Sequence, residues 1–302
     1  MIIHNSRSYD DSPQKPYELT RRLVTNHIED ECEIFLVYGS PEGVGKSAYV
    51  HHVLADLHGY YKCKEQKLVD AMWVKREEAA ALPKWESDWE KIKGYIYYPP
   101  TEVVNKCLHM LDNEIVDVAF HWDDAGKWLY FMEFNDPFVI AFLEYITLAR
   151  TNWKGGIILS TPFKEWVLKK MLNTEGILQI KIHKPPGTDY RYIWKPRIAT
   201  CYRKTRYPGA PRSFFPRVFE DHFSAIMPDS FFDWYEPQRN KYAKIAGRHM
   251  QLALLKRKAK GLDVSDVEQV LAEMQDEIAN ANESAPELLE AIAQVEPQKA
   301  VS

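Results

Sequence analysis

Eight consecutive residues near the start of the chain have the types and spacing that can hold a phosphate group: Ser40, Pro41, Glu42, Gly43, Val44, Gly45, Lys46 and Ser47. They match the nucleotide-binding loop G-x-x-x-x-G-K-[ST] except at Ser40, which replaces the first glycine. Small residues let successive N–H groups turn inward around a phosphate, and serine keeps its N–H. Lys46 would neutralise the β- and γ-phosphates, and the Ser47 hydroxyl would ligate Mg²⁺. These residues predict a site for ATP with magnesium.

The segments on either side of the loop are those that phosphate binding requires. Residues 32–39 (CEIFLVYG) are a short apolar run that predicts a buried strand, and residues 48–59 predict a helix that ends at Gly59. The first turn of such a helix points its positive end at a bound anion. The alternative is an ordinary glycine-rich turn with a surface lysine, which the flanking strand and helix disfavour.

Two adjacent carboxylates supply the second part of phosphoryl-transfer chemistry. Asp123 and Asp124 directly follow an apolar run at residues 115–122 (IVDVAFHW), which predicts a buried strand. Asp123 would hold Mg²⁺ through water, and Asp124 would be the general base that accepts a proton from the attacking water. The alternative is a polar turn after a strand. The phosphate loop earlier in the chain favours the catalytic interpretation.

The elements that must position these residues alternate along the chain. Strands are expected at residues 32–39, 94–98 (GYIYY), 115–122, 155–160 and 177–184. Helices are expected at residues 17–28, 48–59, 100–114, 136–152 and 161–173. Pro100 lies near the start of one helix, and Asp136 is expected to cap another. This alternation predicts an α/β fold with a mainly parallel sheet covered on both faces.

The loop and the acidic pair, as Walker A and Walker B motifs, resemble those of P-loop NTPases of the additional-strand type, a group that includes AAA+, RecA-like and FtsK/HerA ATPases. The resemblance covers residues 31–183 and implies a three-layer P-loop NTPase core that hydrolyses ATP with Mg²⁺. It implies a strand between the loop strand and the acidic strand, a place that residues 94–98 can fill. It also implies a polar residue that senses the γ-phosphate at the tip of the next strand, where Ser160 and Thr161 stand. Asp124 occupies the position at which members usually carry Glu.

The resemblance further implies a homo-oligomer in which a neighbouring subunit supplies an arginine to the site. Arg150 is one candidate, because LARTNWKGGIILSTP is somewhat similar to the corresponding FtsK/HerA segment. The competing candidates are Arg191, Arg197, Arg203 and Arg206. An arginine at a helix end that only satisfies the helix dipole is the alternative for Arg150.

Charge is distributed unevenly beyond the core. Residues 181–260 carry 18 Lys and Arg against 6 Asp and Glu, whereas residues 261–302 carry 1 against 10. We expect a leader and helix (1–30), the ATPase core (31–183, with an insertion at about 60–93), a basic β-hairpin and helix region (184–260) and an acidic helical tail (261–302). Basic residues interleaved with aromatic ones in the third region favour contact with nucleic acid. Two solvated faces that partly neutralise each other are the alternative.

Composition narrows the expected cellular setting. The net charge of −4 and the hydrophobic share of 45% are those of an ordinary globular protein, and no apolar run is long enough to cross a bilayer. The four cysteines lie far apart and the N-terminus has no secretory signal, so we expect a cytoplasmic protein without a cysteine metal site. His51 and His52 are expected on the surface of the loop helix.

Two classes of function stay open. One is an oligomeric motor or loader ATPase that acts on nucleic acid in replication, packaging, transposition or transfer. The other is a nucleotide-controlled switch or scaffold that binds a protein partner through the acidic tail. GTP specificity is disfavoured because no N-K-x-D follows a strand, and the long helical C-terminus disfavours a small-molecule kinase.

Overall fold

The computed structural model describes residues 16–40, 43–63, 87–129, 136–167, 177–185, 196–205 and 213–259. The chain divides into two compact units, residues 1–232 and residues 233–302, and the sheet lies in the first. Within the described ranges, none of the helices has the length and apolar character that crossing a membrane requires.

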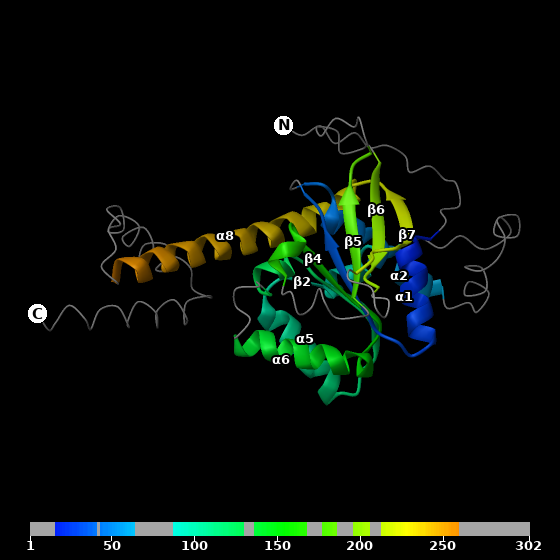
Figure 1. Ribbon diagram of the computed structural model, residues 1–302, viewed down its shortest axis with the longest axis horizontal. Helices are drawn as coiled ribbons and strands as arrows, with labels where there is room; N and C mark the ends of the chain where they lie inside the picture. Colours follow the sequence, from blue (N-terminus) through cyan, green and yellow to red (C-terminus); the bar gives the residue numbers. More distant parts are fainter. Residues whose placement is uncertain are drawn as a thin grey trace, which may run out of the picture. The chain divides into compact units, whose positions relative to one another are not determined.

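A seven-stranded sheet forms the centre of the first unit, in the spatial order β2-β3-β4-β1-β5-β6-β7 (Figure 1). The strands are β1 (Glu33–Tyr38), β2 (Ile96–Tyr97), β3 (Asp117–Trp122), β4 (Trp153–Thr161), β5 (Ile177–His183), β6 (Arg197–Arg203) and β7 (Arg217–Phe223). The first five run parallel, and β6 and β7 add antiparallel strands at one side. The predicted α/β class with a mainly parallel sheet is confirmed.

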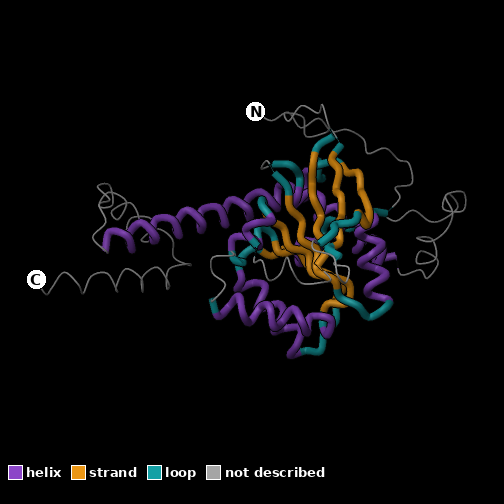
Figure 2. Tube along the Cα trace, viewed as in Figure 1, coloured by secondary structure: helices purple, strands orange, loops and turns teal. Residues whose placement is uncertain are grey.

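Helices cover both faces of the sheet, as the tube view shows (Figure 2). The helices α1 (Glu18–Ile28) and α2 (Lys46–Cys63) lie on one face, and α5 (Pro100–Asp112) and α6 (Pro137–Leu148) lie on the other. In β1, Ile34 and Leu36 join the hydrophobic core beneath α5 and α6, while Phe35 and Val37 point the opposite way and are equally buried. A strand buried on both faces has an uninterrupted apolar sequence, which explains the run CEIFLVYG.

Local sequence signals placed two helix starts correctly. Pro100 occupies the first turn of α5, where its missing N–H costs nothing. The Asp136 carboxylate caps α6 by accepting hydrogen bonds from the backbone N–H groups of Phe138 and Val139, at 2.8 and 3.3 Å.

Other helix boundaries differ from the predictions. The predicted end at Gly59 is wrong, because α2 continues to Cys63. Gly59 is buried, and packing of the surrounding helix offsets the roughly 1 kcal/mol that a helical glycine costs relative to alanine. Of the helix predicted at residues 161–173, the described part contains only a 3-10 turn at Lys164–Trp166. The helix expected in the basic region is α8 (Asp229–Ala259), which contains Pro237 in its interior.

The prediction that residues 94–98 lie between the loop strand and the acidic strand is wrong. Their strand, β2, lies at the edge of the sheet beside β3. The strand between β1 and β3 is β4, which pairs with both in parallel. β4 suits this central place because it is nine residues long and almost entirely buried, whereas β2 has two residues.

The basic region after residue 183 contributes strands to the same sheet. The hairpin predicted across residues 189–204 lies partly outside the described residues, and its second half is β6, which pairs with β5 and β7. Also outside the described residues lie 1–15 of the leader, 64–86 of the insertion and all of the acidic tail.

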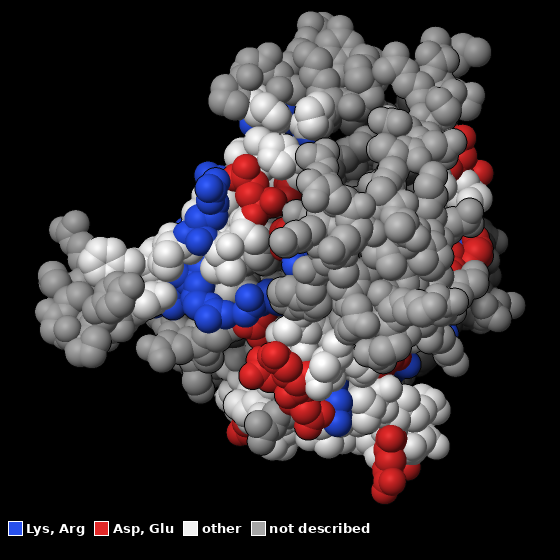
Figure 3. All heavy atoms as spheres, turned by 90° about the vertical axis from the view of Figure 1, so that its right-hand side faces the viewer, with Lys and Arg blue, Asp and Glu red and all other residues white. Residues whose placement is uncertain are grey.

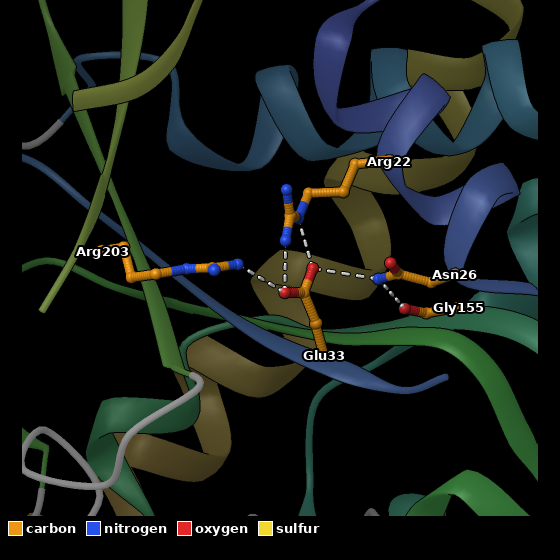
Figure 4. Close-up of polar contacts among 5 residues, drawn as sticks. All are labelled: Arg22, Asn26, Glu33, Gly155 and Arg203. Carbon is orange, nitrogen blue, oxygen red and sulfur yellow. Dashed lines mark hydrogen bonds and ion pairs between the residues drawn. The ribbon is translucent and has the colours of Figure 1, made fainter. Parts of the chain in front are cut away.

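An ionic cluster joins α1, β1 and β6 at the amino end of β1 (Figure 4). Glu33 forms a bidentate ion pair with Arg22, and it accepts a hydrogen bond from Arg203 at 3.1 Å. The Asn26 amide donates hydrogen bonds to the Glu33 carboxylate at 3.0 Å and to the backbone carbonyl of Gly155 at 2.9 Å. These contacts commit Arg203, one of the arginine candidates, to the fold of its own chain.

Candidate nucleotide-binding site

Three parallel strands bring the predicted site residues together at the carboxyl end of the sheet. β1 leads into the loop at residues 40–47, β3 leads into Asp123 and Asp124, and β4 ends with Ser160 and Thr161. Because β4 lies between β1 and β3, its end lies between the loop and the acidic pair. The carboxyl ends of parallel strands are the usual ligand-binding edge of an α/β sheet.

The phosphate loop has a backbone that only glycine adopts readily at two positions. Gly43 and Gly45 have φ angles of +75° and +103°, which other residues rarely take. Lys46 begins α2; the residue is 9% exposed, and its amino group lies 3.5 Å from the carbonyl oxygen of Gly39. Pro41 and Glu42 lie outside the described residues, and Ser40 is exposed. The loop thus holds a buried cation at the positive end of a helix, an arrangement suited to an anion.

Asp123 is the centre of a hydrogen-bond network. Its side chain is 2% exposed. Its Oδ1 atom accepts hydrogen bonds from the hydroxyl of Ser47 at 2.9 Å, the hydroxyl of Ser160 at 2.6 Å and the backbone N–H of Asp124 at 3.1 Å. The two hydroxyl donors come from α2 and β4, so the structure brings together the phosphate loop, the acidic strand and the end of the strand between them.

These neighbours keep Asp123 ionised. Burial alone would raise the pKa of its carboxyl, but the imidazoles of His121 and His51 and the hydrogen bonds from Ser160 and Ser47 outweigh it and lower the pKa to about 2. Burial also lowers the pKa of both histidines, which are therefore uncharged near pH 7. At that pH the hydroxyl donors are the groups that stabilise the carboxylate.

Asp124 differs from Asp123 in its environment. Its side chain is exposed, and its backbone is left-handed with φ of +52°, a conformation that aspartate tolerates better than most residues. Its N–H is shared between Oδ1 of Asp123 and Oγ of Ser160, at 3.1 and 3.2 Å. The turn is therefore fixed while the carboxylate stays open to water, as a general base requires.

Thr161 and Arg150 do not reach Asp123 in this way. The Thr161 hydroxyl donates to the carbonyl of Phe163 at 3.0 Å, so Ser160 is the hydroxyl of β4 that faces Asp123. The Arg150 backbone lies in a 3-10 turn just before β4, and its side chain is outside the described residues. The length of β4 separates that turn from Ser160 by roughly 26 Å, at about 3.3 Å per residue. The Arg150 backbone is therefore far from the Ser160 end of β4 in its own chain.

The competing arginines have no place at this site in the described part of the chain. Arg197 is buried, and Arg203 is bound to Glu33. Arg191 and Arg206 lie outside the described residues.

The prediction that His51 and His52 lie on the surface is wrong, because they are 0% and 6% exposed. Residues that follow β7 pack along α2 and cover both. The carbonyl of Ile226 accepts a hydrogen bond from Nε2 of His52 at 2.7 Å, and the ring of Phe231 packs against His51 with centroids 5.2 Å apart.

Sequence reasoning also missed His121, which lies beside Asp123. Its Nε2 is 3.6 Å from Oδ1 of Asp123. The two residues are two positions apart on a strand, and that spacing places side chains on the same face. This spacing was the one signal in the sequence that could have identified His121.

The oxygen atoms around Asp123 suit Mg²⁺. This ion prefers hard oxygen ligands and is usually held by one or two protein groups together with substrate phosphates and water. A carboxylate and a hydroxyl that lie 2.9 Å apart, those of Asp123 and Ser47, are groups of this kind. Among the described residues, no group of three or more His, Cys, Asp or Glu side chains is placed to hold a metal ion.

Comparison with protein-family models and with curated proteins found no match for this chain.

Proposed function

We propose that this protein is a cytoplasmic Mg²⁺-dependent ATP hydrolase of the additional-strand P-loop NTPase group. The observation that carries the proposal is the convergence of Ser47, Ser160 and Asp123 through hydrogen bonds of 2.9 and 2.6 Å. Ser47 and Ser160 are 76 and 37 positions away from Asp123 in the chain. Each of the three residues has the chemical type that its role in phosphoryl transfer requires.

Each residue of the site has a distinct task in this proposal. The N–H groups of the loop and the amino group of Lys46 bind the phosphates, and Ser47 and Asp123 hold the magnesium ion. When bound, that ion neutralises charge on the β- and γ-phosphates. Ser160 fixes the Asp123 carboxylate and the turn that carries Asp124. Asp124 accepts the proton of the attacking water.

Binding and chemistry should separate at the acidic pair. The Asp124→Asn variant should bind ATP with Mg²⁺ as tightly as the wild type and lose turnover by about 10²–10⁴-fold, because a carboxamide cannot accept the proton of water. Fluorescent-nucleotide titration and phosphate release measure the two properties on the same sample.

Asp123→Asn is the matched comparison, because it makes the same chemical change one residue away. It should weaken the magnesium dependence of nucleotide binding as well as turnover. Normal turnover in Asp124→Asn together with lost turnover in Asp123→Asn would mean that the base is another group.

We further propose that the ATPase acts on nucleic acid as an oligomer. The support is the excess of 18 basic over 6 acidic residues in positions 181–260, together with the placement of Arg150 away from its own site. Part of this basic charge serves the fold, because Arg203 pairs with Glu33 and Arg217 with Glu220. The face shown in Figure 3 carries both signs of charge, with the largest area of Lys and Arg at the left of the view and smaller ones elsewhere. In the second unit, the α8 residues Arg239, Lys241 and Lys244 are exposed.

Nucleic-acid binding should be steeply salt-dependent. If six or more phosphates are contacted, affinity should fall about 10³-fold or more between 50 and 200 mM salt. Replacing Arg239, Lys241 and Lys244 by alanine should reduce the slope of log affinity against log salt by up to about three. Fluorescence anisotropy with single- and double-stranded oligonucleotides, with ATP present, measures this slope.

The control is Arg203→Ala, which removes a cation that Glu33 already engages and should leave the slope unchanged. If the full-length protein does not bind nucleic acid at low salt, the proposal of a nucleic-acid partner is refuted. The basic region would then be better explained as a subunit interface, and the protein as a nucleotide-controlled switch or scaffold.

A further inference from the structure

His121 is fully buried, yet its ring nitrogens lack hydrogen-bond partners. Its exposed fraction is 0%, and neither Nδ1 nor Nε2 has a partner among the described residues. Leaving a buried polar atom unsatisfied costs about 1–3 kcal/mol. Native proteins keep few such atoms, and each one needs a physical explanation.

The surroundings of His121 direct it toward Asp123. Asp123 directly follows β3 and stands two positions after His121, and Nε2 of His121 is 3.6 Å from Oδ1 of Asp123, just beyond hydrogen-bond distance. On its other side the ring meets the edge of His51 from α2, with centroids 5.3 Å apart and an interplanar angle of 66°. His51 is itself packed against Phe231. The imidazole is therefore held between the ring of His51 and the carboxylate of Asp123.

The carboxylate of Asp123 needs fixed donors. A metal-binding carboxylate works at one orientation, and the groups that hydrogen-bond to it set that orientation. Ser160 provides one such donor from the β4 side. The imidazole of His121 can provide a side-chain donor from the β3 side, since a neutral imidazole carries one N–H.

We propose that His121 is a positioning residue for Asp123: the Nε2–H of His121 donates to the carboxylate and, together with Ser160, fixes the orientation in which that carboxylate would hold Mg²⁺. The inference rests on the proposed function, because it assigns His121 to the same magnesium site. Outer partners of metal ligands typically change metal affinity or activity 10–100-fold when removed. His121 should act on magnesium dependence and leave the binding of metal-free nucleotide unchanged.

Nucleotide binding by the full chain, with and without magnesium, tests this role. The titrations use a fluorescent ATP analogue in EDTA and then in increasing Mg²⁺. His121→Leu fills the same space without a donor, and it should raise the Mg²⁺ concentration for half-maximal enhancement of binding about 10–100-fold. His121→Gln can place an amide N–H near the position of Nε2 and should restore most of that loss. All variants should bind equally in EDTA.

The matched control is His58→Leu. His58 is another buried histidine with an unsatisfied Nε2, but it lies farther along α2 and packs against Tyr95. The His58→Leu variant should have the same magnesium dependence of nucleotide binding as the wild type. Should His121→Leu not fold, His121→Asn replaces it, because its shorter amide does not extend to the position of Nε2 and should show the same shift.

The outcomes separate this inference from the proposed function. A wild type that binds no nucleotide in either condition refutes the ATPase and the role of His121 with it. A wild type with magnesium-dependent binding, and a His121→Leu variant that matches it, overturns the positioning role alone. Equal losses in the Leu and Gln variants, or an equal shift in His58→Leu, would also overturn it, because packing rather than the N–H donor would then be responsible.

Discussion

Lys46→Ala should lose nucleotide affinity by about 10–100-fold, because hydrogen bonds to a charged group contribute about 1.5–3 kcal/mol. Turnover should fall further, by about 10²–10³-fold, since the lysine also faces the charge that develops on the transferred phosphoryl group. Lys46 is buried, and it is the only Lys or Arg in the sequence of residues 40–47. Calorimetric or fluorescent titration with ATP, followed by phosphate release, measures both effects.

Lys154→Ala is the control for this variant. Lys154 lies at the start of β4, at the opposite end of the strand from Ser160, where it pairs with Asp30. Its removal should change neither affinity nor turnover. If Lys46→Ala binds and hydrolyses ATP like the wild type, the loop at residues 40–47 is not the nucleotide site.

Mild acid should destabilise the fold steeply. Burial is the main reason that the pKa values of His52 and His58 are lowered to about 4, from about 6.5 in an unfolded chain. A lowered folded-state pKa means that the stabilisation is present above pH 6.5 and is lost as the pH falls toward 4. Each histidine should cost about 1.4 kcal/mol per pH unit in that window, so the two together remove roughly 4 kcal/mol by pH 5.

The other buried groups do not reverse this trend. His51 and His121 change in the same direction, because burial lowers their pKa values too. Asp221 opposes it, since burial raises the pKa of its carboxyl above the usual value and its protonation favours the folded state. That opposing effect acts between the raised folded-state pKa and the usual value near 4, and it comes from one carboxyl against four buried histidines. The total loss approaches the 5–15 kcal/mol that stabilises a typical domain.

Urea unfolding between pH 7.5 and 5 measures this slope. His58→Leu should reduce the slope by about 1.4 kcal/mol per pH unit, because one proton fewer is taken up on unfolding. His109→Leu, on the exposed surface of α5, is the matched control and should leave the slope unchanged. A protein whose free energy of unfolding is constant from pH 7 to 5 would contradict the prediction.

Features that depend on short-range chemistry could be predicted from the sequence. The strand β1 follows from an uninterrupted apolar run. The helix starts at Pro100 and Asp136 follow from the backbone N–H groups that the first turn of a helix leaves unpaired. The loop could be recognised because its glycines are needed for positive φ at residues 43 and 45. Each of these depends on a few neighbouring residues and therefore leaves a local pattern.

The site itself was decided by the tertiary structure. Ser160 meets Asp123 because β4, and not the strand at residues 96–97, lies between β1 and β3, and strand order is a matter of pairing over long distances in the chain. His51 and His52 are buried because residues after β7 pack along α2, a contact that helical periodicity within α2 does not reveal. His121 stands beside Asp123 through a local spacing of two residues, but its burial comes from packing against His51 of α2. The sequence by itself thus determined which residues are chemically able to bind a nucleotide. Long-range packing decided which of these residues meet and which histidines are buried beside them. The reason is that burial and strand order depend on segments that are distant in the chain.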